Sequence, residues 1–283
     1  MSPAGRRSAT RRPRVGVVKF ASCDGCQLTV LGLEDELLAI AERFDIVEFA
    51  EATSRRSAGP FDVLLVEGSI STDEQLEELL RLRRETTTLV TIGACATAGG
   101  IQAIRNWSEY GPWAAAVYPQ PELVPSLAMA TPVADHVVVD AELRGCPIDP
   151  GQLLELLTAL VVGRRPQLPD ESVCAECKRR GAVCVVVAHG VACLGPVTRT
   201  GCGALCPVFG RGCYGCFGPR SGANVKSLIA NAAGLDDSVA SARFAGFTAW
   251  AEPFRSVIDS HGGPPGASPA TVPTGSSERG GRS

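Results

Sequence analysis

Short apolar runs recur along the first half of the chain at intervals typical of buried strands. Each run is four to six residues long and is followed by polar or glycine-containing sequence. Separate amphipathic segments lie between the first and second runs and between the third and fourth, so the runs are unlike the pieces of one long helix. We predict five strands, at residues 15–20, 46–49, 63–66, 89–92 and 136–139.

Three segments between or after these runs carry helical signals. Residues 28–44 place Leu31, Leu38 and Phe44 on one helical face. Ser71 and Glu74 stand at capping-box spacing before a leucine stripe. Strands that alternate with helices at this spacing indicate an α/β fold, a flavodoxin-like doubly wound parallel sheet. The third helix is predicted to begin at Asp149 and Pro150, to carry Leu153, Leu156, Leu157, Leu160 and Val161 on one face, and to end at Gly163.

The character of the sequence changes near Arg164. Residues 174–216 contain eight cysteines, many glycines and only one short apolar run, and such a segment cannot build a core from its own side chains. Residues 223–258 predict one or two helices interrupted at Gly234. We therefore divide the chain into a basic tail at 1–13, a flavodoxin-like domain at 14–163, a loop-rich unit at 164–220, a helical extension at 221–259 and a tail at 260–283. Both tails are predicted to be disordered.

Composition excludes several classes of function. The formal net charge is -3, so the chain has no overall basic field for nucleic acid, and no run is long enough to cross a membrane. The apolar run after the N-terminal arginines is broken by Lys19, which argues against a secretory or twin-arginine signal. We expect a cytoplasmic protein, where thiols stay reduced and twelve cysteines indicate metal rather than disulfides.

Four cysteines follow predicted strands of the first domain. Cys23 and Cys26 follow the first strand, Cys95 follows the strand ending at 92, and Cys146 follows the last strand. Loops at the carboxyl edge of a parallel sheet converge, so these four thiols are expected to meet at one site. Four thiolates suit zinc and an iron–sulfur cluster equally, and any one of them could instead be an ordinary buried cysteine.

The remaining eight cysteines resemble the two halves of a two-cluster bacterial ferredoxin, with looser spacing. All eight are expected to be ligands, and the order in ferredoxins suggests one set of Cys174, Cys177, Cys184 and Cys216 and another of Cys193, Cys202, Cys206 and Cys213. The rival is a zinc ribbon built on Cys174, Cys177, Cys213 and Cys216, in a zinc-stabilised binding module that uses the basic arm as its contact surface. That interpretation leaves four cysteines without a role.

Several motifs together are similar to one known family. They are Cys23-Asp24-Gly25-Cys26, residues 66–70 (Val-Glu-Gly-Ser-Ile), residues 92–95 (Ile-Gly-Ala-Cys), Gly145-Cys146-Pro147 and the cysteine motifs at 193–219. In this order they resemble the small subunit of nickel–iron hydrogenases, specifically the delta-type subunit of the soluble, multimeric group 3 enzymes. The resemblance covers roughly residues 14 to 220.

The resemblance implies an electron-transfer subunit without catalytic residues of its own. Cys23, Cys26, Cys95 and Cys146 would hold a proximal [4Fe-4S] cluster beside the nickel–iron site of a separate large subunit. The eight later cysteines would hold medial and distal [4Fe-4S] clusters, which would pass electrons to a flavin, NAD(P)-binding diaphorase-type or iron–sulfur partner. Alone, the chain should have no hydrogenase activity.

Two further residues and one related family complete these expectations. Glu67, at a strand end, could tune the proximal cluster or relay protons, and a purely structural glutamate is an equal alternative. His189 is expected to be structural, because twelve cysteines suffice for three clusters. The 20-kilodalton subunit of NADH:quinone oxidoreductase shares the first domain, but it typically has two adjacent cysteines in the first motif and lacks the eight-cysteine extension.

Overall fold

The computed structural model describes residues 11–231, 235 and 237–263, including all twelve cysteines. The strands are β1 (Arg14–Lys19), β2 (Asp45–Phe49), β3 (Phe61–Glu67), β4 (Thr86–Ile92) and β5 (Ala141–Leu143). The helices of the first half are α1 (Gly25–Leu31), α2 (Asp35–Ala41), α3 (Asp73–Arg84), α4 (Gly93–Ala98), η1 (Ile101–Trp107), α5 (Tyr110–Val117), η2 (Pro121–Leu123), η3 (Val133–Asp135) and α6 (Pro150–Val162). They are followed by α7 (Val173–Arg179), α8 (Val185–His189), α9 (Leu205–Val208), α10 (Val225–Asn231), α11 (Asp237–Phe244) and α12 (Phe254–Ser260).

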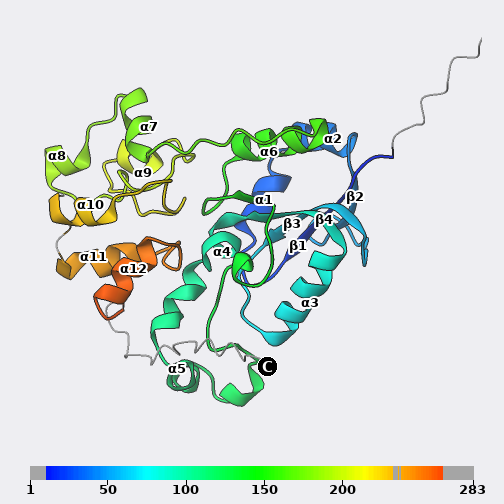
Figure 1. Cartoon of the computed structure of the whole chain (residues 1–283), viewed down its shortest axis with the longest axis horizontal. Coiled ribbons are helices and arrows are strands. Elements are labelled where there is room, and N and C mark those ends of the chain that lie inside the picture. Colours follow the sequence, from blue (N-terminus) through cyan, green and yellow to red (C-terminus); the bar gives the residue numbers. More distant parts are fainter. Residues whose placement is uncertain (1–10, 232–234, 236, 264–283) are drawn as a thin grey trace, which may run out of the picture.

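The five strands form one sheet in the order β2-β1-β3-β4-β5, and every pairing is parallel. This is the flavodoxin-like order, so the predicted fold class is confirmed. The sheet occupies one end of the molecule, and α7 to α10 occupy the other (Figure 1). All five strands point the same way, so the loops that carry functional residues leave from one edge.

Side chains alternate across the sheet and build a core on each face. Val17, Leu65 and Val90 pack with α1 and α6, whereas Leu64, Val66 and Leu89 pack with α3. Leu79 and Leu82 are the buried positions of α3, and Leu153, Leu156 and Leu157 bury the predicted stripe of α6. Two apolar layers against one sheet explain why this half of the chain folds around its own side chains.

The predicted position of the fifth strand was wrong. Residues 136–139 form a turn and an irregular segment, and β5 begins at Ala141. The pairing with β4 is set by Asp140, whose amide donates to Leu89 O (2.9 Å) and whose carboxylate accepts from the amide of Leu89 (2.8 Å). Val138 is 73% exposed, so the apolar run that suggested a strand does not enter the sheet.

Two helix predictions also need correction. The single helix expected at 28–44 is two helices, because the chain turns between α1 and α2 at Gly32 and at Glu34, which has a φ of 48°. Leu38 is 67% exposed rather than buried. The cap of α3 is Thr72, not Ser71: the Thr72 hydroxyl accepts from the amide of Gln75 (3.2 Å), and Gln75 Oε1 accepts from the amide of Ser71 (2.8 Å).

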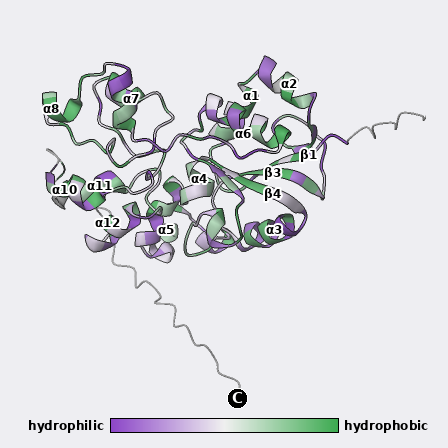
Figure 2. Ribbon diagram, turned by 45° about the horizontal axis from the view of Figure 1, so that its top comes forward, coloured by the Kyte–Doolittle hydropathy of each residue, from purple (hydrophilic) through white to green (hydrophobic). Residues whose placement is uncertain are grey.

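The second half of the chain has short helices and no strand among its described residues. Figure 2 shows α7, α8 and α10 to α12 gathered at one end, beside the sheet domain. One buried cluster joins the cysteine-rich unit to the C-terminal helices and includes Leu194, Phe244, Phe254 and Ile258. Residues 164–220 and 221–259 therefore share a core.

The C-terminal helices also contact the sheet domain. Trp107 Nε1 donates to Asp259 Oδ1 (2.7 Å), and the ring of Trp107 meets that of Trp250 edge-on at 5.3 Å. Where one or two helices were predicted over 223–258, the described residues there form α10, α11 and α12, and the expected break at Gly234 lies outside the described residues. The tail expectations fall mostly on residues 1–10 and 264–283, which also lie outside them. No helix in the part of the chain that the structure describes is long and apolar enough to span a membrane.

Candidate metal centres

Cys23, Cys26, Cys95 and Cys146 meet at the carboxyl edge of the sheet, as predicted. Each of the four thiols interacts electrostatically with at least two of the others. The β4–α4 and β5–α6 connections are joined directly, because the amide of Ala94 donates to Gly145 O (2.7 Å). We call these four cysteines the inner group.

Gly93 shows how closely the backbone approaches the inner group. A Cβ at this position would lie 2.4 Å from Cys26 Sγ, closer than any two such atoms can approach. Gly93 also has a φ of 84°, in the left-handed region that favours glycine. The glycine of the Ile-Gly-Ala-Cys motif is therefore a steric requirement of the site.

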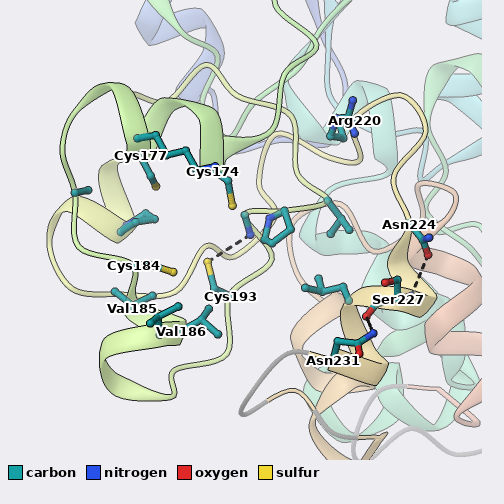
Figure 3. Close-up of a pocket in the computed structure, with 18 of the residues that line it drawn as sticks. Cys174, Cys177, Cys184, Val185, Val186, Cys193, Arg220, Asn224, Ser227 and Asn231 are labelled. Carbon is teal, nitrogen blue, oxygen red and sulfur yellow. Dashed lines mark hydrogen bonds between the residues drawn. The ribbon is translucent and has the colours of Figure 1, made fainter.

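A second set of four thiols lines a pocket of about 570 Å³ on the far side of the molecule. Figure 3 shows Cys174 and Cys177 on α7, Cys184 before α8, and Cys193 on the following loop, around one hollow. A Cβ at Gly195 would lie 3.3 Å from Cys193 Sγ and 3.5 Å from Cys174 Sγ, so these two sulfur atoms face a common point. We call these four cysteines the outer group.

The remaining four cysteines form a middle group. Cys216 interacts electrostatically with Cys202, Cys146 and Cys206, and Cys213 interacts with Cys193 and Cys216. The pairing suggested by ferredoxins stays a prediction, but in this structure Cys193, rather than Cys216, lines the pocket with Cys174, Cys177 and Cys184. The physical reason is the path of the chain: Cys193 lies on the loop beside α7 and α8, whereas Cys216 returns to the sheet domain.

The middle group connects the other two. The backbone amide of Cys146, from the inner group, donates a hydrogen bond to the Cys216 thiol. On the other side, the amide of Cys213 donates to Cys193 Sγ of the outer group (3.2 Å). The three groups thus follow one another in the order inner, middle, outer.

An aromatic ring fixes the junction of the inner and middle groups. A Cβ at Gly145 would lie 2.9 Å from Phe217 Cζ, and a Cβ at Gly201 would lie 2.6 Å from Phe217 Cε1. The Phe217 side chain is 3% exposed. It is therefore held between the loop that precedes Cys146 and the loop that precedes Cys202.

Comparisons with known proteins agree with this architecture. The family described as NADH ubiquinone oxidoreductase, 20 Kd subunit, matches residues 23–160. Sulfhydrogenase 2 subunit delta of Pyrococcus furiosus is 38% identical over 216 residues, which cover 76% of this chain and 90% of the relative. The chain belongs to the small subunits of nickel–iron hydrogenases.

Two further comparisons extend the match. A subunit of the F420-non-reducing hydrogenase of Methanocaldococcus jannaschii is 30% identical over 254 residues, covering 77% of this chain and 88% of the relative. A chain of the NAD+-reducing [NiFe]-hydrogenase in the H2-reduced state superposes with a TM-score of 0.53 at 31% identity, covering 56% of this chain and 96% of that chain. The recognition made from the sequence motifs is confirmed, and so is the expectation of a subunit of an oxidoreductase complex.

Burial is the main cause of the raised pKa values of the thiols in this hydrogenase small subunit. Burial raises the pKa of Cys95 and of Cys174 to about 11 each and that of Cys216 to about 12. Neighbouring thiols add to the effect at each position. Four clustered, desolvated thiols are poorly suited to bear charge alone, whereas a cation that they share stabilises their thiolate forms.

Hydrogen bonds from backbone amides offset part of the rise in pKa that burial causes. The amide of Ile148 donates to Cys26, those of Ala204 and Leu205 donate to Cys202, and that of Gly215 donates to Cys213 Sγ (3.4 Å). Such donors stabilise negative charge on sulfur and are a feature of iron–sulfur sites.

The donor set suits zinc and an iron–sulfur cluster alike. All twelve cysteines are free thiols. Among the described residues, no group of three or more His, Cys, Asp or Glu side chains is placed to hold one metal ion.

Glu67 is buried beside the inner group, as its place at the end of β3 suggested. Its carboxylate accepts hydrogen bonds from the amides of Cys26 (3.1 Å) and Gln27 (3.3 Å) and from Gln27 Nε2 (3.0 Å). Glu67 thereby holds the first turn of α1, where Cys26 lies. Its charge also raises the pKa of the Cys26 thiol, although burial has the larger effect.

Glu176 is a site residue that the sequence did not reveal. It lies between Cys174 and Cys177 on α7, and its Oε2 accepts from the amide of Ala204 (3.0 Å) and from the Thr200 hydroxyl. The carboxylate thus ties α7, from the outer group, to the loop that carries Cys202 of the middle group. No sequence motif predicts this link, because the partners are 24 and 28 residues away. His189, by contrast, lines the neighbouring groove between α8 and α9.

Proposed function

We propose that this small subunit carries electrons through three [4Fe-4S] clusters, between the nickel–iron site of a large subunit and an acceptor module of the NAD(P), flavin or iron–sulfur type. One observation carries the proposal: twelve free thiols form three consecutive groups of four that run from the sheet edge to the opposite end of the molecule. Three such sites in series suit a relay better than three isolated structural sites.

Each of the three groups of cysteines would hold one cluster of the relay. The inner group would hold the cluster nearest the nickel–iron site, the middle group the second and the outer group the third. When bound, the clusters supply reversible one-electron transfer. The chain's own part is to hold the thiolates, exclude water from them and direct amides toward their charge.

Glu67 supports the inner thiols in this proposal. By accepting from the amides of Cys26 and Gln27, it orients the α1 turn, and it places one negative charge beside the inner thiols. It is not needed as a ligand, since four cysteines are already present. No catalytic residue is assigned to the chain, because hydrogen splitting belongs to the nickel–iron partner.

The names of the relatives support the assembly. Sulfhydrogenase and NAD+-reducing [NiFe]-hydrogenase are complexes in which the matched chains are subunits. We infer a nickel–iron large subunit and a diaphorase-type or iron–sulfur acceptor as partners. Twelve unpaired thiols fit a reducing compartment, so we also infer a cytoplasmic location.

The first test counts metal in anaerobically purified protein. Three cubane clusters predict about twelve iron and about twelve acid-labile sulfide per chain. Colourless protein with stoichiometric zinc would instead support the zinc-stabilised binding module.

The second test removes one inner thiol. In the complex with its large subunit, Cys95→Ala should remove or convert one cluster and abolish hydrogen-dependent dye reduction, while nickel remains bound in the partner. Thr97→Ala, which removes one hydroxyl from the same helix, is the matched control and should keep both properties. Undiminished dye reduction with all cluster signals intact in Cys95→Ala would contradict the proposal.

Co-purification separates the alternative of the same class. The matched family carries the name of the respiratory 20 Kd subunit, so a quinone oxidoreductase remains the second candidate. The eight cysteines beyond residue 160 favour the hydrogenase. A nickel-bearing partner would support it, whereas a quinone-linked membrane arm would support the respiratory complex.

A further inference from the structure

The two short helices around the outer group expose an unusual amount of apolar surface. Val183 is 67% exposed, Val187 86% and Phe209 75%, and Leu205 and Val208 are also exposed. Single exposed apolar side chains are ordinary, but a contiguous group of them marks an interaction site. We call these five residues, on and beside α8 and α9, the α8–α9 face.

Three residues of this face, Val183, Val187 and Val208, line two neighbouring hollows, and Leu205 and Phe209 belong to or follow the same helix α9 as Val208. A groove of about 540 Å³ is lined by Val183 before α8 and by Pro207 and Val208 of α9. Val187 of α8 also lines the pocket that holds the four outer thiols. Cys184 of that set is itself exposed. The α8–α9 face therefore surrounds the place where the outer group comes closest to solvent.

The charge of this part of the chain is one-sided. Residues 177–235 contain no aspartate or glutamate and seven lysines and arginines, although the whole chain has a net charge of -3. Lys178 and Arg180 line the two hollows, and Arg211 follows Phe209 by two residues. All three are exposed. The apolar face thus has a basic rim, and the carboxylates that reach this part of the molecule from outside the range are already bonded: Glu171 pairs with Arg179, and Glu176 accepts from Ala204 and Thr200.

We propose that the α8–α9 face docks an acidic electron-carrying protein, which has an apolar centre and a ring of carboxylates around its own redox group. The proposal rests on the proposed function, because it takes the outer group as the exit of the relay. Charge complementarity identifies the partner: basic side chains around an apolar centre favour an acidic surface and accelerate its encounter.

A second copy of this chain fits the face poorly. A symmetric dimer would place Lys178, Arg180 and Arg211 of one copy against the same cations of the other. With no acidic residue in 177–235 to pair with them, like charges would meet around the apolar centre.

The test uses the hydrogenase complex and a purified acidic ferredoxin that carries two [4Fe-4S] clusters. Binding of the ferredoxin and its hydrogen-dependent reduction are measured at low and high NaCl. Phe209→Asp places a charge in the apolar centre, and Arg211→Glu reverses one rim charge. Val162→Asp and Arg43→Glu are matched controls, since both residues are exposed and lie in the sheet domain.

We expect the native complex to bind the ferredoxin with an affinity that falls as salt rises. Each face variant should weaken binding by about tenfold or more, and the controls should not. Iron content and viologen reduction should be unchanged in all variants. Absence of ferredoxin binding by the native complex, equal binding by the face variants, or loss of self-association alone would overturn the proposal. A native complex that lacks iron or cannot reduce viologen would instead contradict the proposed function.

Discussion

The sheet domain and the cysteine-rich unit differ in how far their thiols take part in the core. In the sheet domain, a core of valines, leucines and phenylalanines forms on both faces of the strands, and Cys26 is the one inner cysteine that belongs to it, whereas Cys23, Cys95 and Cys146 are less buried. In the second unit, Cys193 and Cys213 belong to the buried core itself, at 6% and 5% exposure. The first core is built almost entirely from side chains that are not expected ligands, whereas the second includes two expected ligands among its packing residues.

Metal removal should therefore have the largest effect of the changes predicted here, and it should affect the two regions differently. After anaerobic chelation of iron, amide hydrogen exchange should remain slow in β1, β3 and β4 and become fast in α7, α8 and α9. The reason is that clustered, desolvated thiols in the second unit lose the cation that offsets their burial. Equal loss of protection in both regions, or in neither, would contradict this difference.

The second prediction concerns the close approach of the Gly93 backbone to the inner group. Gly93→Ala places a methyl group against Cys26 Sγ, so about a third of the bound iron should be lost while the other two sites remain filled. Gly163→Ala is the control, because Gly163 has a φ of 69° but no atom within 4 Å of an added Cβ. It should cost about 1 kcal/mol of stability and no iron. Iron analysis measures the bound iron, and urea unfolding measures the stability of each variant. Full iron content in Gly93→Ala would contradict the close packing of Gly93 against Cys26.

The third prediction concerns the link between the middle and outer groups. Glu176→Gln keeps an oxygen for the Ala204 amide but removes a negative charge, so clusters held by both groups should become easier to reduce. At a fixed potential, their reduced-to-oxidised ratio should rise by about tenfold or less, and the inner cluster should not change. Redox titration followed by electron paramagnetic resonance measures each signal.

Glu171→Gln is the matched control for that change. Glu171 pairs with Arg179 at the surface, and both side chains are more than half exposed. Its loss should shift no potential and alter stability by less than about 1 kcal/mol. Equal shifts of the reduction potentials in Glu176→Gln and Glu171→Gln would show that Glu176 acts only through the net charge of the chain and not through its position.

The sequence was sufficient for the parts of the molecule that depend on local pattern. Periodicity predicted four strands of the sheet at nearly their observed places, and it predicted α6 with its cap at Asp149. The inner group followed from topology, because strand ends of a parallel sheet converge. The fifth strand was misplaced because the apolar run before it packs outside the sheet, and Asp140 decides where pairing starts.

Long-range contacts account for what the sequence did not show. That Cys193, rather than Cys216, lines the pocket with Cys174 depends on how the chain returns to the sheet domain, which spacing cannot encode. The hydrogen bonds of Glu176 join residues from separate loops. The shared core with α11 and α12 likewise escaped prediction, because their apolar residues showed helices but not the surface that those helices cover.

The ring of Phe217, held between Gly145 and Gly201, determines how far apart two of the sulfur groups can be. In the proposed relay, tunnelling would weaken steeply with each added ångström, so the thickness of this ring would influence the hopping rate. A methyl group at Gly145 would collide with Pro147 O (2.5 Å) as well as with the ring, and one at Gly201 with Gln152 Nε2 (2.2 Å), so the spacing at this junction can be disturbed without touching a cysteine.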